Sequence, residues 1–340
     1  MRESSVETFR WLAAFSAQPA QSSSNPYQRL NRLLACIAAV FAGLGALWVA
    51  SGHFRIDPGP YFLLALVVLP CIGGVYFYTR VRSEPVFAAM LAATAFLMVF
   101  PAACSLMSYL ATTIAGPRID ANLLAIDRAF GISWPAIMAF AGDHRFLADT
   151  LGLAYQSIIP QTLLLVLLLG WTRKPDQLYG LCLAIAGGAT LTLLFWIAFP
   201  SFGAYSMYHL PLATQMKLSL VEGVDYGQQL TNLLKNGPGF IEPKDLRGII
   251  GFPSYHTVQA IVLAWYARKL PYLGWLFLAL NIAVVCATPI HGGHHLIDIP
   301  GGAIVAALVI FIADRLVKKL GGKAAPAAVP APQSLDPARA

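Results

Sequence analysis

The sequence predicts an all-α protein that crosses a membrane about eight times. Hydrophobic residues make up 57% of the 340-residue chain and charged residues only 11%. The mean hydropathy of +0.64 is far too high for a soluble domain of this size. In addition, uncharged stretches long enough to cross about 30 Å of hydrocarbon as helices recur along the chain. These observations together indicate a polytopic membrane protein.

The predicted crossings are stretches of predominantly apolar residues separated by polar or charged connections. The first apolar stretch begins about thirty residues into the chain and is too long for a cleaved signal peptide, so it should persist as a crossing. Two later crossings begin with motif residues. In chain order, the predicted crossings are residues 33–52, 60–79, 86–110, 147–170, 178–199, 254–269, 272–289 and 294–313.

Basic residues in alternate connections predict the orientation in the membrane. Cytoplasmic connections are enriched in Lys and Arg, and here every second connection carries them: Arg80 and Arg82, Arg173 and Lys174, Arg268 and Lys269, and Arg315 to Lys323. Both termini are therefore expected in the cytoplasm. The net charge of +7 reflects this bias, and no basic patch with interleaved aromatic residues suggests a nucleic-acid partner.

The two ends of the chain are polar and fall outside the predicted crossings. Residues 1–28 form a predicted cytoplasmic segment that contains a short amphipathic stretch, Val6 to Phe15. Residues 318–340 are rich in Ala and Pro and are predicted to be a disordered cytoplasmic tail. The five cysteines lie singly in apolar stretches, which predicts neither a disulfide framework nor a Cys metal motif.

Two segments on the predicted outer side are long for simple connections. Residues 113–146 mix charged and apolar positions in the pattern of a helix that lies along the membrane interface. Residues 200–250 form a longer polar insert that contains Gly237-Pro238-Gly239. Segments of this length are often functional, so together these two could cover a site. The alternative is that they only connect crossings.

A first motif, Gly251 to His256 (GFPSYH), begins a predicted crossing on the outer side. Ser254 is suited to be the N-cap of that helix, which places His256 in the first turn. Free backbone N–H groups and the positive end of the helix dipole then face any anion held there. The motif therefore predicts a phosphate site.

A second motif, His291 to Asp298 (HGGHHLID), follows about forty residues later on the same side. His294 and Asp298 are four positions apart, so on a helix they would share one face. Asp298 could then hold the His294 imidazole in one tautomer and leave its other nitrogen free to attack. A purely structural pairing of these two residues is the alternative.

Two histidines of this kind suit phosphoryl transfer without a metal or another cofactor. One imidazole, His294, attacks phosphorus to form a phosphohistidine, and the other, His256, gives a proton to the leaving alkoxide. Cations should offset the charge of the phosphoryl oxygens, and the bases best placed in the sequence are Lys244, Arg247 and Arg118.

The pattern Pro-Ser-x-His followed by Gly-x-His-x-x-x-Asp resembles the type 2 phosphatidic acid phosphatase superfamily. The Phe-Pro-Ser-Tyr-His form and the double histidine at 294–295 look most like its inositol phosphorylceramide synthase branch. The resemblance implies a six-helix catalytic core over residues 86–317, preceded by two extra crossings within residues 29–85. It also implies His294 as nucleophile, Asp298 as its orienting group, His256 as general acid and Ser254 as a hydrogen-bond donor to phosphate.

The substrate implied by the resemblance is a phospholipid, a sphingolipid or a polyprenyl phosphate. The reaction is either hydrolysis or transfer of a phosphorylated head group such as inositol phosphate. The first motif of the superfamily, a Lys followed after six residues by Arg-Pro, has no match in this chain.

Two alternatives come from other classes of protein. His291, His294, His295 and Asp298 supply nitrogen and oxygen ligands at spacings that a transition metal could use, so a metal-binding membrane protein is one alternative. A transporter with proton-relay histidines is the other. The Pro-Ser-Tyr-His sequence favours phosphate chemistry over metal binding.

Overall fold

The structure, a computed structural model, describes residues 27–51, 54–222, 226–243, 246 and 248–321. These residues are mainly helical, and the strands among them are β1 (Arg55–Ile56) and β2 (Phe240–Ile241), which pair in parallel. Six helices are long and apolar enough to cross a membrane, or up to eight if each of two bent helix pairs is one crossing. The predicted class, an all-α polytopic membrane protein, is confirmed.

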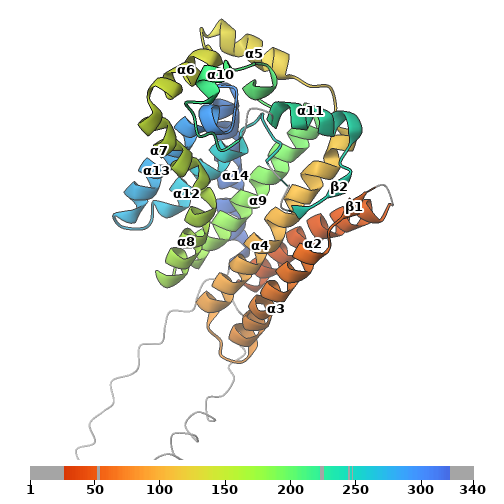
Figure 1. Ribbon diagram of the computed structural model, residues 1–340. Coiled ribbons are helices and arrows are strands. Elements are labelled where there is room, and N and C mark those ends of the chain that lie inside the picture. The colour runs from red at the N-terminus through yellow and green to blue at the C-terminus, as the bar shows by residue number, and fades with distance from the viewer. Residues whose placement is uncertain (1–26, 52–53, 223–225, 244–245, 247, 322–340) are drawn as a thin grey trace, which may run out of the picture.

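The first three long helices lie side by side along one flank of the bundle (Figure 1). They are α2 (Gln28–Ala50), α3 (Gly59–Arg80) and α4 (Pro85–Ala111), and α2 and α3 both pack against α4. Large apolar side chains of α3, such as Phe62 and Leu69, are about 60% exposed. So much exposed apolar surface along a helix suits contact with lipid and would be costly in water.

Helix α9 (Pro175–Ala198) is the most buried of the long helices and packs against α4, α12 and α14. Small residues allow this close approach. A Cβ added at Gly180 would lie 2.5 Å from Tyr266 of α12, and one added at Gly188 would lie 2.6 Å from Val258. Small residues at helix contacts are the usual means by which membrane helices approach closely.

Three helices begin or end at the histidine motifs, and two of them, α12 and α14, pack against α9. The three helices are α12 (Tyr255–Ala267), α13 (Leu273–His291) and α14 (Asp298–Leu320). Helix α12 packs against α8, α9, α13 and α14. With 13 residues it is about 20 Å long, shorter than the predicted crossing 254–269 and shorter than the hydrocarbon layer.

The predicted start of the last crossing, residue 294, is wrong. Helix α14 begins at Asp298, so His294 and His295 lie on the preceding loop and do not share a helical face with Asp298. Gly293, with φ of +60°, turns the chain there into a conformation that helices do not contain. At its other end α14 continues to Leu320, so the first residues of the predicted tail 318–340 are helical.

Helices α7 (Arg145–Gln156) and α8 (Ile158–Trp171) correspond to the predicted crossing 147–170, with a bend of 50° between them. The amphipathic stretch Val6 to Phe15 and residues 322–340 of the predicted tail lie outside the described residues.

Short helices cover one end of the bundle (Figure 1). We call these elements the cap: η1 (Thr112–Ile114), α5 (Asp120–Ala129), α6 (Trp134–Asp143), η2 (Ala204–Ser206), α10 (Leu212–Gln215) and α11 (Tyr226–Asn236). They come from the two long segments of the sequence, 113–146 and 200–250, which therefore meet at the same end. The angle between α5 and α6 is 75°.

Candidate active site

The two histidine motifs meet at the end of the bundle that the cap covers. Ser254 is the N-cap of α12, and its Oγ accepts a hydrogen bond of 3.3 Å from the backbone N–H of Thr257. The N–H of Ser254 in turn donates to the carbonyl of Asp298 at 3.1 Å. Gly302 permits this approach, because a Cβ there would lie 2.5 Å from the Ser254 carbonyl oxygen. The backbone thus ties the start of α12 to the start of α14.

His294 and Asp298 form a buried pair. Nδ1 of His294 lies 3.0 Å from Oδ2 of Asp298, and both side chains are almost inaccessible to solvent. The same carboxylate oxygen accepts the backbone N–H of His295 at 3.0 Å, and the N–H of Asp298 donates to the carbonyl of His295 at 3.1 Å. A turn before α14 therefore creates the contact that was predicted from helical spacing.

The second nitrogen of His294 points away from the carboxylate. Its Nε2 lies 3.4 Å from Oγ of Ser254, which is the residue predicted to contact phosphate. Because Asp298 occupies Nδ1, the Nε2 lone pair is the one available for attack. The arrangement is that of an oriented nucleophile beside a helix N-terminus.

His256 faces His294 from the first turn of α12. The centroids of the two rings are 6.0 Å apart and the rings are nearly perpendicular. Nδ1 of His256 lies 3.1 Å from the hydroxyl of Tyr155 on α7, and those two rings stack with centroids 4.3 Å apart. Tyr155 was missed by the sequence analysis, since a tyrosine in an apolar stretch carries no signal of a catalytic partner 101 positions away.

A cavity of about 510 Å³ contains both histidines. Its wall is formed by α4, α7, α8, α9, α12, the start of α11 and the loops before α12 and α14. Two lining residues of α8, Ile159 and Leu163, are 71% and 51% exposed, and Pro101 of α4 is also exposed. Since α4 is one of the membrane-crossing helices, the cavity extends from the histidines to the lipid-facing surface between α4 and α8.

The predicted phosphate-binding bases are not among the described residues that line this cavity. Arg118 lies in the cap, where Nε and Nη2 bind Asp120 at 2.8 and 2.7 Å and Nη2 also donates to Ser206. Lys244 and Arg247 lie outside the described residues. Among the lining residues that the structure describes, the charged side chain is that of Glu222, which the sequence analysis did not single out.

The remaining histidines of the second motif turn to different partners. Nε2 of His291 lies 2.8 Å from the carbonyl of Ala148, which joins α13 to α7. The side chain of His295 lies between two carboxylates of the cap. Within the part of the chain that the structure describes, no group of three or more His, Cys, Asp or Glu side chains is placed to hold a metal ion.

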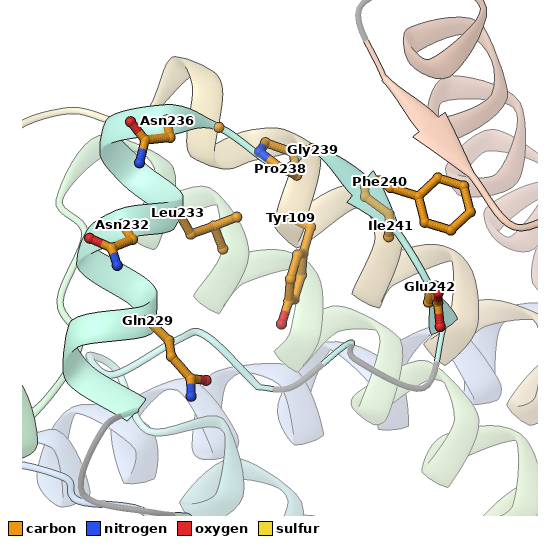
Figure 2. Close-up of a pocket in the computed structure, with 11 residues that line it drawn as sticks. Tyr109, Gln229, Asn232, Leu233, Asn236, Pro238, Gly239, Phe240, Ile241 and Glu242 are labelled. Carbon is orange, nitrogen blue, oxygen red and sulfur yellow. The ribbon is translucent and has the colours of Figure 1, made fainter.

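A second pocket of about 290 Å³ lies between α11, β2 and the last turn of α4 (Figure 2). Tyr109 of α4 projects toward it, and α11 carries Gln229, Asn232 and Asn236 along its edge. No histidine is among the described residues that line it, so it contains none of the groups that the two motifs bring together.

Comparison with known families identifies the group of proteins to which this arrangement belongs. The sequence model of the PAP2 superfamily matches residues 121–312, more than half of the chain and all of both histidine motifs. The chain belongs to the PAP2 superfamily. No curated protein and no solved structure matched it in the same comparisons.

Membership of the PAP2 superfamily supports a function of the lipid phosphatase type. Enzymes of the superfamily are generally phosphoric ester hydrolases that act on lipid phosphates in membranes, which agrees with the polytopic fold. The matched range starts within α5 and ends within α14, so α4 contributes to the histidine cavity from outside it.

Proposed function

We propose that the chain is a membrane enzyme that removes or transfers the phosphoryl group of a lipid phosphate through a phosphohistidine at His294. One observation carries the proposal. Nε2 of His294, with Nδ1 held by Asp298, faces Ser254 and His256 in a cavity that reaches the lipid-facing surface. When the phosphate of a lipid lies at Ser254, it can contact both imidazoles, while the apolar chains of that lipid extend between α4 and α8.

In the first half of the reaction, Nε2 of His294 attacks phosphorus and the bond between phosphorus and the leaving oxygen breaks. Protonated His256 gives its proton to that oxygen, a step typically worth about 10²–10⁴ in rate. Asp298 stabilises the positive charge that develops on the His294 ring. In the second half, neutral His256 takes a proton from water or an acceptor alcohol, whose oxygen attacks phosphorus and releases His294.

The phosphoryl oxygens need positive partners. The Ser254 hydroxyl and the N-terminus of α12 supply hydrogen-bond donors. Arg118 is bound to Asp120 and does not line the cavity, so we assign this role to Lys244 and Arg247 rather than to Arg118. Arg247 directly precedes Gly248, which lines the cavity.

Hydrolysis and transfer share the first half-reaction and differ in whether water or an alcohol reaches the phosphohistidine. Hydrolysis would act on substrates such as phosphatidate, phosphatidylglycerol phosphate or polyprenyl diphosphate. The segment FPSYH at residues 252–256 and the His294-His295 pair resemble the inositol phosphorylceramide synthase branch. This resemblance favours transfer of a phosphorylated head group to a lipid alcohol. The excess of Lys and Arg in the connections at the opposite end supports a reaction on the outer face.

Purified protein in detergent tests this function directly. The substrates are phospholipids and polyprenyl phosphates, with and without diacylglycerol, ceramide and inositol, and the products are free phosphate and new lipids detected by mass spectrometry. Free phosphate that is lost in His294→Ala establishes a phosphatase. A new head-group lipid without matching phosphate release establishes a transferase. An enzyme that keeps its activity as His294→Ala refutes the nucleophile.

A further inference from the structure

A buried histidine that the proposed reaction does not use lies directly beside the nucleophile. His295 is completely buried, with Nε2 3.6 Å from Oδ1 of Asp120 and Nδ1 3.6 Å from Oδ2 of Asp127. Asp120 and Asp127 are themselves 1% and 3% exposed. They are seven positions apart on α5 and therefore share one face of that helix, two turns apart. The imidazole lies between them.

The same two carboxylates hold backbone groups of the loops around the site. Asp127 accepts hydrogen bonds from the N–H groups of Leu296 and Ile297, at 2.9 and 3.0 Å, in the loop that carries His294. Asp120 accepts the N–H groups of Phe202 and Gly203, at 2.9 and 3.0 Å, in the loop that follows α9. Helix α5 therefore joins both loops.

The charges of this cluster balance only if His295 is protonated. The charged groups around its ring are Asp120 and Asp127 on α5, Asp298 at the start of α14, and Arg118, which binds Asp120. Asp298 is hydrogen-bonded to His294, which the proposed reaction needs neutral, so it adds negative charge beyond the two carboxylates of α5. With a neutral His295, one cation would face two buried carboxylates, and an unpaired buried charge is costly. With an imidazolium at His295, the carboxylates of Asp120 and Asp127 face two cations, Arg118 and His295.

The titration of His295 agrees with this count. Burial alone would lower the pKa of His295, but its contact with Asp120 and the charges of Asp298, Asp120 and Asp127 outweigh burial and raise that pKa. Burial likewise opposes ionisation of Asp120, yet the contacts with His295, Arg118 and Ser201 lower the pKa of that carboxyl. Both shifts favour the ion pair.

We propose that His295 is a buried imidazolium and a positioning residue, whose charge joins Asp120 and Asp127 and so holds α5 against the loop that carries His294 and Asp298. A histidine with a raised pKa stabilises the fold fully below its unfolded value of about 6.5 and loses that contribution as the pH rises through the folded value. The cap contact should therefore weaken on the alkaline side.

The charge of His295 can be observed without any assay of activity. Protein labelled with ¹⁵N in its seven histidines is studied by NMR in micelles, and the signal missing in His295→Gln or His295→Lys is that of His295. At about pH 7.5, one unit above the ordinary value, both ring nitrogens should still be protonated. Asp127→Asn should shift the titration to lower pH, whereas Asp143→Asn, a change at an exposed aspartate of the cap that binds Lys217, should not.

A neutral His295 at that pH, or a titration unaffected by Asp127→Asn, would overturn the proposal. If His295→Gln does not fold, His295→Lys retains the cation and supplies the assignment. The two Asp variants test the charge without changing His295 itself.

A second experiment measures the effect on catalysis and rests on the proposed function. His295→Gln should lower kcat about 10- to 100-fold, the range typical of the outer partners that orient metal-bound histidines, with little change in KM. Asp127→Asn combined with His295→Gln restores the charge balance, so its loss should be smaller than the product of the two single losses. Losses that simply multiply would contradict the role of charge.

A wild-type protein inactive on every lipid phosphate would refute the proposed function, and the NMR result would still decide the state of His295.

Discussion

At the scale of single residues, two hydrogen bonds determine which nitrogen of each histidine is free to react. Asp298 binds Nδ1 of His294, and the hydroxyl of Tyr155 binds Nδ1 of His256. In both rings Nε2 is then the nitrogen that can contact the substrate. The proposed roles of nucleophile and general acid depend on these two contacts.

Asp298→Asn should leave the fold nearly unchanged and almost abolish turnover. The amide oxygen can keep both hydrogen bonds that Oδ2 accepts, from His294 and from the N–H of His295, but a neutral amide no longer stabilises the positive charge that develops on the His294 ring. We expect kcat to fall about 10⁴-fold, the loss seen for the same change in a Ser-His-Asp triad. Turnover of the purified variant, with its thermal stability as the control, measures this. Activity within tenfold of wild type would show that the charge of Asp298 does not support His294.

Tyr155→Phe should have a smaller effect. It removes one hydrogen bond, worth about 1 kcal/mol, and keeps the ring that stacks on His256. The expected loss in kcat/KM is roughly fivefold. Thr150→Val on the same helix is a matched control, because its hydroxyl bonds only to the helix backbone at Phe146. Equal effects of the two changes would argue against a role for Tyr155 at His256.

The residues of the two motifs could be identified from sequence because serine, glycine, histidine and aspartate stand there at short, regular spacings in an apolar chain. The residues around them could not. Tyr155, Asp120 and Asp127 reach the motifs only through the tertiary fold, and both aspartates looked like charges of an interfacial helix. In the structure they point inward and bind His295 and the loop backbones.

At the scale of helices, close packing of α9 on α12 places the first motif. Gly188→Ala should destabilise the protein, since the added Cβ would lie 2.6 Å from Val258 and push α12 away. Such overpacking typically costs about 1–3 kcal/mol. Gly43→Ala on α2 is the control, because nothing lies within 4 Å of its Cβ position. Thermal unfolding in detergent compares the two, and an equally stable Gly188→Ala protein would contradict this account of the contact.

The helices themselves were predicted more accurately than their ends. Hydrophobic length alone found every long helix, since lipid imposes an apolar surface on any segment that crosses it. The start of α14 was wrong by four residues because the spacing of His294 and Asp298 suggests one helical face, whereas the positive φ of Gly293 and the turn at His295 keep the chain out of the helix until Asp298.

At the scale of the whole molecule, the cap and the histidines lie at one end of the bundle, and the connections rich in Arg and Lys lie at the other. The bias in basic residues predicts that the cap is outside the cytoplasm. In a cysteine-free protein, Phe130→Cys on the cap should react with a membrane-impermeant thiol reagent in intact cells. Lys269→Cys, between α12 and α13, should react only after lysis. The reverse pattern would invert the orientation.

The central claim is that His294 carries the phosphoryl group, and detection of the phosphoenzyme tests it most directly. Wild-type protein is mixed with lipid phosphates, quenched at alkaline pH, where phosphohistidine survives, digested, and analysed by mass spectrometry. The account predicts a phosphoryl group on His294, formed more slowly in His256→Ala because that variant cannot protonate the leaving oxygen, and none in His294→Ala. Turnover by His294→Ala, or a phosphoryl group on another residue, would contradict it.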